Sequence, residues 1–145
     1  LHIIGSDTND SNFFKKKLSD ENIIIYGHIP QYKLNNIINK CHVFVLPSIE
    51  DGFGIVVLQA AAGGCPCIVS KNTGAADFVS KNNCGHVVPI RDSNSIAENL
   101  QNLSDDKNLL NQLSINAINA TRNYTWSNYV SKLEDLIFQF KENKL

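Results

Sequence analysis

The sequence predicts an α/β fold in which a parallel sheet is flanked by helices and followed by a helical tail. Short apolar runs rich in Val and Ile alternate with helical patterns over residues 1–90, and this alternation is typical of βαβ units. The runs are apolar at consecutive positions, as expected for strands buried on both faces of a sheet. Beyond Pro89 only helical patterns remain. We therefore expect a single domain, with a Rossmann-like core over residues 1–90 and C-terminal helices over residues 91–145.

The elements of the core follow in a regular order. Strands are expected over residues 1–4, 22–26, 42–46, 66–70 and 86–88. Helical patterns fall between them, over residues 11–18, 31–40, 55–62 and 75–80. The first of these strands ends in Gly5, and the fourth is preceded by a small-residue helix that can press closely on the sheet. Together these elements predict a core of five parallel strands.

The tail is predicted to hold three helices. Ser93 is a candidate N-cap for the first, because apolar residues recur behind it at helical spacing. A second helix is expected to start at Asp105, and a third to cover residues 127–141. Their apolar stripes indicate packing against a core or an interface.

Composition excludes several classes of protein. The chain has 145 residues, of which 43% are hydrophobic and 19% charged, so it can bury a core and is not a disordered segment. Thirteen Lys and Arg balance 14 Asp and Glu, and the sequence lacks the basic stripe of a nucleic-acid-binding surface. The four cysteines form no C-x-x-C pair, which favours free thiols in a reducing compartment. The chain contains no Met and opens inside a strand-like run, so we expect a fragment of a longer protein.

A glycine-rich turn between a predicted strand and a predicted helix carries the chemistry. The turn reads Asp51-Gly52-Phe53-Gly54. Gly52 and Gly54 allow the backbone to approach a ligand closely. The helix begins near Ile55, and the unpaired N–H groups of Ile55 and Val56 suit a diphosphate. In an open parallel sheet, ligands bind beyond the carboxyl ends of the strands, which is where this turn lies.

Two polar side chains frame this candidate anion site. Asp51 precedes it, and its carboxylate can accept hydrogen bonds from sugar hydroxyls. Gln59 lies five residues beyond Gly54, about 7 Å along a helix that rises about 1.5 Å per residue. That distance suits a ribose.

The wider pattern resembles the donor-site signature of the family-four glycosyltransferases, which are built from two Rossmann-like domains (the GT-B type). The matching residues are Pro47-Ser48, Asp51, Gly52-Phe53-Gly54, Gln59, Gly64, Pro66, Ile68, Gly74 and Asp77. Flanking residues extend the resemblance over nearly the whole chain, from Leu1–Gly5 to Tyr124-Thr125-Trp126. The sequence departs from the family at two acids: Asp51 stands where Glu is usual, and Gln59 replaces a second Glu.

The resemblance implies the C-terminal, donor-binding domain of a retaining hexosyltransferase of polysaccharide biosynthesis. Such an enzyme moves a sugar from a nucleotide diphosphate donor to a glycan or lipid-linked acceptor held by an N-terminal domain. Asp51 is then the catalytic residue. The loop Gly27-His28-Ile29 and the strand ending in Gly5 complete the donor site, with the nucleotide base met mainly by backbone. This fragment alone is expected to be inactive.

The resemblance also implies a site without metal or cofactor, in which the nucleotide sugar is the donor substrate. The expected location is the cytoplasm or the inner face of the membrane, where the full-length enzyme would associate peripherally. Two other functions stay open at this point. The chain could be half of a sugar-nucleotide epimerase or glycan phosphorylase on the same architecture. It could also be a non-catalytic interaction domain that kept the fold, which the replacement at Gln59 would support.

Overall fold

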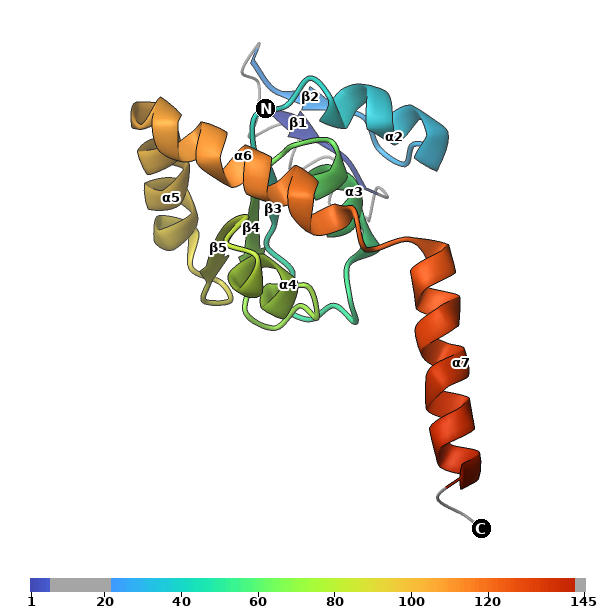
Figure 1. Ribbon diagram of the computed structural model, residues 1–145. Helices are drawn as coiled ribbons and strands as arrows, with labels where there is room; N and C mark the ends of the chain where they lie inside the picture. The colour runs from blue at the N-terminus through green and yellow to red at the C-terminus, as the bar shows by residue number, and fades with distance from the viewer. Residues whose placement is uncertain (6–21, 143–145) are drawn as a thin grey trace. The chain divides into compact units, whose positions relative to one another are not determined.

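The computed structural model describes residues 1–5 and 22–142, and the chain divides into two compact units, Leu1–Ile37 and Ile38–Leu145. Figure 1 traces the chain from blue at the N-terminus to red at the C-terminus. The helix expected over residues 11–18 lies outside the described residues.

The first unit contains a pair of short parallel strands. Strand β1, His2–Ile3, pairs with β2, Ile24–Ile25, so that His2 lies opposite Ile24. Helix α2, Gln31–Ile38, follows and ends one residue into the second unit. Both strands are shorter than expected, and Ile24 and Ile25 are exposed. The expectation that every strand is buried on both faces is therefore wrong for this pair.

The second unit is built on a three-stranded parallel sheet in the order β3-β4-β5. The strands are β3, Phe44–Leu46; β4, Cys67–Ser70; and β5, Gly85–Val88. All four residues of the central strand β4 are buried. The five expected strands are thus all present, and each pairs in parallel with its neighbour. Hydrogen bonds join them as a pair and a triplet among the described residues, and not as the one continuous sheet that the sequence suggested.

Four helices pack around the triplet. Helix α3, Ile55–Ala62, links β3 to β4, and α4, Ala76–Lys81, links β4 to β5. Helices α5, Ser93–Asp105, and α6, Lys107–Thr121, follow, and α6 contacts both α5 and α3 (Figure 1). Ile68 of β4 and Val88 of β5 pack with Leu103 and Leu113 in the core.

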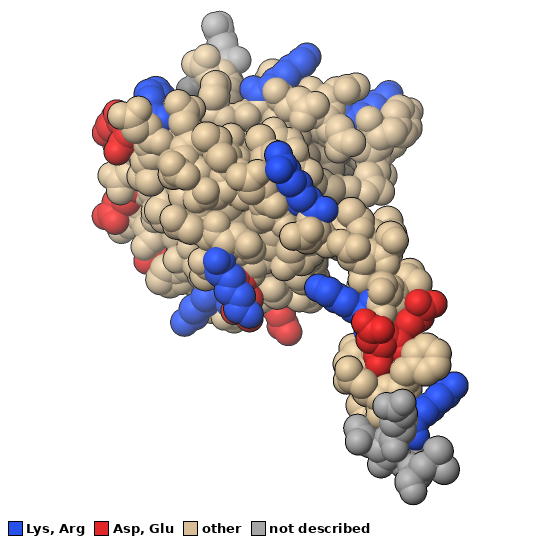
Figure 2. Space-filling view, in the orientation of Figure 1, with Lys and Arg blue, Asp and Glu red and all other residues tan. Residues whose placement is uncertain are grey.

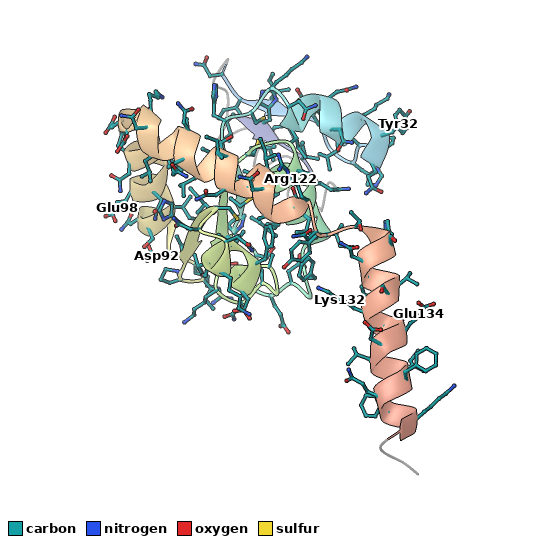
Figure 3. The ribbon with its side chains drawn as sticks, in the orientation of Figure 1. Tyr32, Asp92, Glu98, Arg122, Lys132 and Glu134 are labelled. Atoms are coloured by element: carbon teal, nitrogen blue, oxygen red, sulfur yellow. The ribbon has the colours of Figure 1, made fainter. Side chains whose placement is uncertain are left out.

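Asp92 and Asp106, each one residue from the predicted start, cap the first two helices of the tail. Asp92 caps α5, because its carboxylate accepts hydrogen bonds from Ser95 N at 3.0 Å and Ser95 Oγ at 2.7 Å. These bonds lower the pKa of the Asp92 carboxyl, which lies at the start of α5 in Figure 3. The N-cap predicted at Ser93 is therefore wrong by one residue. Likewise α6 begins at Lys107 behind an Asp106 cap, and not at Asp105.

The last helix, α7, spans Trp126–Glu142. Thr125 begins it, since the Thr125 hydroxyl accepts a hydrogen bond from Asn128 N at 3.2 Å. From Trp126 to Lys141 every side chain is exposed, including the apolar ones. Lys132 and Glu134 are labelled on this helix in Figure 3. Within the described residues, no helix combines the length and apolar character needed to cross a membrane.

Charge is spread over the molecular surface in view. Figure 2 shows basic and acidic side chains interspersed among uncharged ones on that face. This fits the near balance of 13 basic and 14 acidic residues in the sequence.

Candidate functional site

The glycine-rich turn lies at the carboxyl end of β3, beside the turn that follows β4. We call residues 47–54 the donor loop, after the ligand that the sequence resemblance predicts there, and residues 70–74 the bracing turn. Asp51 N donates to Asn72 O at 3.3 Å, and Gly74 N donates to Asp51 O at 3.2 Å. Together they form an isolated parallel bridge between Asp51 and Thr73. Because parallel strands end at the same edge of a sheet, both turns are placed where ligands of α/β proteins bind.

Gly54 joins the donor loop to α3 in a conformation that glycine favours. Its φ is 69°, in the left-handed region. A Cβ on this residue would lie 3.0 Å from Leu46 Cδ2. Helix α3 then begins at Ile55, as predicted, with no side-chain cap and no acidic residue in its first turn. Its N-terminus therefore keeps the partial positive charge that attracts anions.

Gly52 is different, because neither its conformation nor its packing requires glycine. Its φ is not positive, and a Cβ placed on it would meet no heavy atom within 4 Å. The residue is exposed at the surface. A glycine in such a place is typical of backbone that another molecule approaches closely.

The side chains of the predicted site surround this turn. The Asp51 carboxylate lies beside the start of α3, since a Cβ on Gly54 would be 3.6 Å from Asp51 Oδ1. Asp51, Val56 and Gln59 are half-buried. Phe53 and Ile55 are 39% and 58% exposed. The turn thus presents a carboxylate, bare backbone and apolar surface close together.

The remaining predicted site residues belong to the first unit. Gly5 N donates to Gly27 O at 3.0 Å, so the ends of β1 and β2 are joined there. Gly27 has a φ of 65°. His28, the next residue, is exposed, and Ile29 is half-buried. Contact of these four residues with a donor stays a prediction.

Sequence reasoning missed the polar residues that hold the donor loop. Ser70 and Thr73 are both buried. Ser70 Oγ donates to Ser48 O, and Thr73 Oγ1 donates to Ser70 O at 2.9 Å. The available signal was their position at the end of a predicted strand, for Ser70, and three residues beyond it, for Thr73.

Three cysteines are buried, and burial weakens their thiols as nucleophiles. Burial raises the pKa of Cys65 and Cys84 to about 11 and raises that of Cys67 still further. Neighbouring thiols add to the effect at Cys65 and Cys67. A thiol that stays protonated at neutral pH is a poor nucleophile. No disulfide joins the four cysteines, all of which lie in the described part of the chain, as the spacing predicted.

Comparison with known proteins gives a family match over most of the chain. The family described as "Glycosyl transferases group 1" matches residues 1–120. Among curated proteins, the chain is 34% identical over 110 residues to a UDP-Gal:alpha-D-GlcNAc-diphosphoundecaprenol alpha-1,3-galactosyltransferase of Escherichia coli. That match covers 75% of this chain and 28% of the relative.

Solved structures share the fold at lower sequence identity. A sucrose-phosphate synthase from Thermosynechococcus elongatus matches with a TM-score of 0.82 at 23% identity, over 99% of this chain and 39% of that one. The Anabaena protein HepE, solved in complex with UDP-glucose, matches with a TM-score of 0.79 at 16% identity, over 95% and 40%. The chain spans less than a third of the length of the first curated relatives that it matches.

Proposed function

The chain belongs to the group 1 glycosyltransferases, and we propose on that premise that it is the nucleotide-sugar-binding half of a retaining glycosyltransferase. The single observation that carries the proposal is Gly52, whose bare backbone faces open space beside an uncapped helix N-terminus and the Asp51 carboxylate. Such a surface suits a diphosphate with a sugar attached. The UDP-glucose bound by HepE supports this choice of ligand class.

In the proposed reaction the donor diphosphate lies at the N-terminus of α3. The bond between the anomeric carbon and the diphosphate oxygen breaks, and the acceptor oxygen bonds to the same face of that carbon. The leaving diphosphate takes the acceptor proton. The protein contributes placement and charge stabilisation: the α3 N–H groups hold the diphosphate, and Asp51 accepts hydrogen bonds from the sugar.

The acceptor in this proposal is a glycan or lipid-linked molecule bound by a part of the enzyme outside this chain. The E. coli relative, which is named for a diphosphoundecaprenol-linked acceptor, supports that class. We place the full-length enzyme in polysaccharide biosynthesis, in the cytoplasm or at the inner face of the membrane.

No metal takes part in the proposed reaction, because the N-terminus of α3 supplies the positive potential for the diphosphate. Sugar transfer should therefore persist in EDTA.

Nucleotide titration of the Gly52→Leu variant tests the proposal. Calorimetry with UDP and with GDP should show that the wild-type chain binds at least one of them. In Gly52→Leu the new side chain enters open space, so Tm should be retained. Nucleotide binding should weaken by at least about tenfold, because a bulky group at this position blocks the approach of the ligand to the backbone.

Ser80→Leu supplies the matched control. Ser80 is exposed on α4, so this variant also adds a leucine to the surface but leaves the donor loop intact, and it should bind nucleotide as the wild type does. A wild-type chain that binds neither nucleotide would contradict the proposal and favour a non-catalytic interaction domain. Equal affinity in Gly52→Leu and wild type would remove the donor loop from the site.

A further inference from the structure

The backbone of Asp51 is held on both sides by the bracing turn. Its N–H donates to Asn72 O at 3.3 Å, and its carbonyl accepts from Gly74 N at 3.2 Å. The turn in turn is fixed to the sheet, because Lys71 N donates to Val88 O of β5 at 2.9 Å. The position of the Asp51 peptide is therefore fixed by β4 and β5, through the bracing turn, as well as by its connection to β3.

Two buried hydroxyls extend this support to the start of the donor loop. Ser70 ends β4, is 1% exposed and donates to the carbonyl of Ser48. Thr73 is 4% exposed and donates to the carbonyl of Ser70 at 2.9 Å. A buried hydroxyl without a partner costs free energy, so each of these bonds specifies one geometry. The Thr73 hydroxyl thus holds the backbone of Ser70, and the Ser70 hydroxyl holds the backbone of Ser48.

The two glycine turns are also in direct steric contact. A Cβ on Gly74 would lie 2.0 Å from Gly52 O and 3.1 Å from Phe53 Cα. The Gly52–Phe53 peptide thus rests against the backbone of Gly74. Any side chain at position 74 would push that peptide outward.

We propose that the bracing turn positions the donor loop, with Ser70 and Gly74 as positioning residues that set where Asp51 and the Gly52–Phe53 peptide meet the sugar. This inference rests on the proposed function. Neither residue touches the donor; each acts through the donor loop. Misplacement of reacting groups by about 1 Å can lower a rate by about a hundredfold, so a loosened brace should lower turnover more than it lowers stability.

A matched pair of serine variants in the full-length protein tests the brace. Ser70→Ala removes the hydroxyl bond to Ser48 O. Ser114→Ala removes a bond of the same kind, from Ser114 Oγ to Gly64 O at 2.6 Å, between α6 and the turn after α3. Both should show a similar fall in Tm. Only Ser70→Ala should lower kcat, by at least about fivefold, because only its bond holds the donor loop.

Two further readouts separate positioning from general loosening. Calorimetric affinity for UDP or GDP should stay within about twofold of wild type in Ser70→Ala, since the α3 N-terminus is unchanged. Amide hydrogen exchange of residues 47–54 should accelerate in Ser70→Ala and not in Ser114→Ala. Turnover is measured with UDP-glucose, UDP-galactose and GDP-mannose, using whichever of them the wild type accepts.

The outcomes distinguish this inference from the proposed function. A wild-type protein that binds neither UDP nor GDP overturns both. A wild type that binds and turns over a donor, with kcat and exchange alike in Ser70→Ala and Ser114→Ala, overturns the brace alone. If Ser70→Ala does not fold, Thr73→Val loosens the bracing turn instead, because it removes the bond that holds the Ser70 carbonyl while keeping the side-chain shape. Thr121→Val is its control, because the Thr121 hydroxyl bonds only within α6. Unchanged kcat in Thr73→Val then overturns the inference.

Discussion

Asp51 combines a fixed backbone with a side chain directed to the start of α3. Its peptide is bonded on both sides by the bracing turn, so replacing only the carboxylate should leave the loop in place. In the full-length enzyme we expect Asp51→Asn to lower kcat by at least about tenfold, because a sugar-facing carboxylate acts in the transition state. Turnover at saturating donor is the measurement. Equal kcat in Asp51→Asn and wild type would remove Asp51 from the catalytic group.

Gln59 is half-buried on α3, and restoring the family's acid there should change nucleotide affinity. A charged hydrogen bond to the ribose gains about 1 kcal/mol over a neutral one. Repulsion from the diphosphate at about 7 Å and an effective dielectric of about 20 costs about 2 kcal/mol per unit charge before screening. Gln59→Glu should therefore bind UDP or GDP more weakly at low salt, with the deficit shrinking as salt rises.

The control for that change is Gln112→Glu, which adds the same charge on the exposed surface of α6. It should leave affinity unchanged and lower Tm only slightly, because it removes the exposed bond from Gln112 Nε2 to Asn116 Oδ1 at 3.1 Å. Calorimetry at several salt concentrations gives the comparison. An affinity that Gln59→Glu leaves unaltered at every concentration would show that Gln59 does not face the ligand.

We expect His86 to make the stability of the fold depend on pH. Its Nε2 is buried without a hydrogen-bond partner among the described residues, and burial lowers the pKa of the imidazole. The unfolded chain, with a His pKa of about 6.5, binds protons more readily than the folded one. Above a pH of about 6.5, His86 therefore does not lower the stability of the fold, and it lowers that stability increasingly as the pH falls below this value. We expect Tm to decline from about pH 7 to pH 5, and less steeply in His86→Phe.

The residues of the donor loop were predictable because their signal is local. A strand, a glycine turn and a helix follow one another in the sequence from 43 to 62, and the structure starts α3 at Ile55 as expected. Ser70 and Thr73 were not predictable in the same way. Their partners lie 22 and 3 residues away in the sequence. The bond from Ser70 to Ser48 depends on the register between two turns, which only the folded sheet fixes.

At the scale of elements, some helix boundaries were likewise predictable from the sequence and others were not. Helix α3 was placed correctly over residues 55–62 because both ends carry glycine. The starts of α5 and α6 were misplaced by one or two residues, since neighbouring Ser and Asp residues all suit an N-cap. The carboxylate of Asp92 reaches both Ser95 N and Ser95 Oγ, which decides between Asp92 and Ser93.

Asp106 is the cap whose removal should matter most for a single helix. Its Oδ1 accepts from Asn108 N at 3.0 Å and from Leu109 N at 2.9 Å. Loss of such a cap costs about 0.5–2 kcal/mol, so Asp106→Ala should lower the free energy of unfolding by that amount in urea denaturation. Asp105→Ala is the neighbouring control, because Asp105 bonds only Gln101 Nε2 within α5 at 2.8 Å. Equal losses in the two variants would contradict the capping role.

The pairing of strands lies beyond what the apolar pattern encodes. Val-rich and Ile-rich runs identified all five strands, but the same runs did not show that Ile24 and Ile25 are exposed. The sequence of α7 likewise has an apolar stripe, and its side chains, Trp126 among them, are exposed in the described structure. An apolar pattern indicates which face is suited to burial; the neighbouring elements determine whether it is buried.

For the whole molecule, we expect this chain to bind the nucleotide but not to catalyse sugar transfer by itself. The matched curated relatives are several times longer than this chain, which covers 28% of the E. coli enzyme. We expect the 145-residue chain to bind UDP or GDP yet to form no glycoside from a nucleotide sugar. Full-length protein supplies the positive control. Product formation by the chain alone would show that the acceptor site lies within it.

The contact between the two glycine turns also constrains how this sequence can diverge. Position 74 has no room for any side chain, since a Cβ there meets Gly52 O at 2.0 Å, so selection for the fold alone should hold it as glycine. Position 52 has open space and an ordinary φ, so selection for the fold alone should let it drift. In copies that have lost their substrate, glycine should therefore disappear from position 52 while persisting at position 74. Substitution at position 52 would then mark the loss of activity in a lineage that still folds.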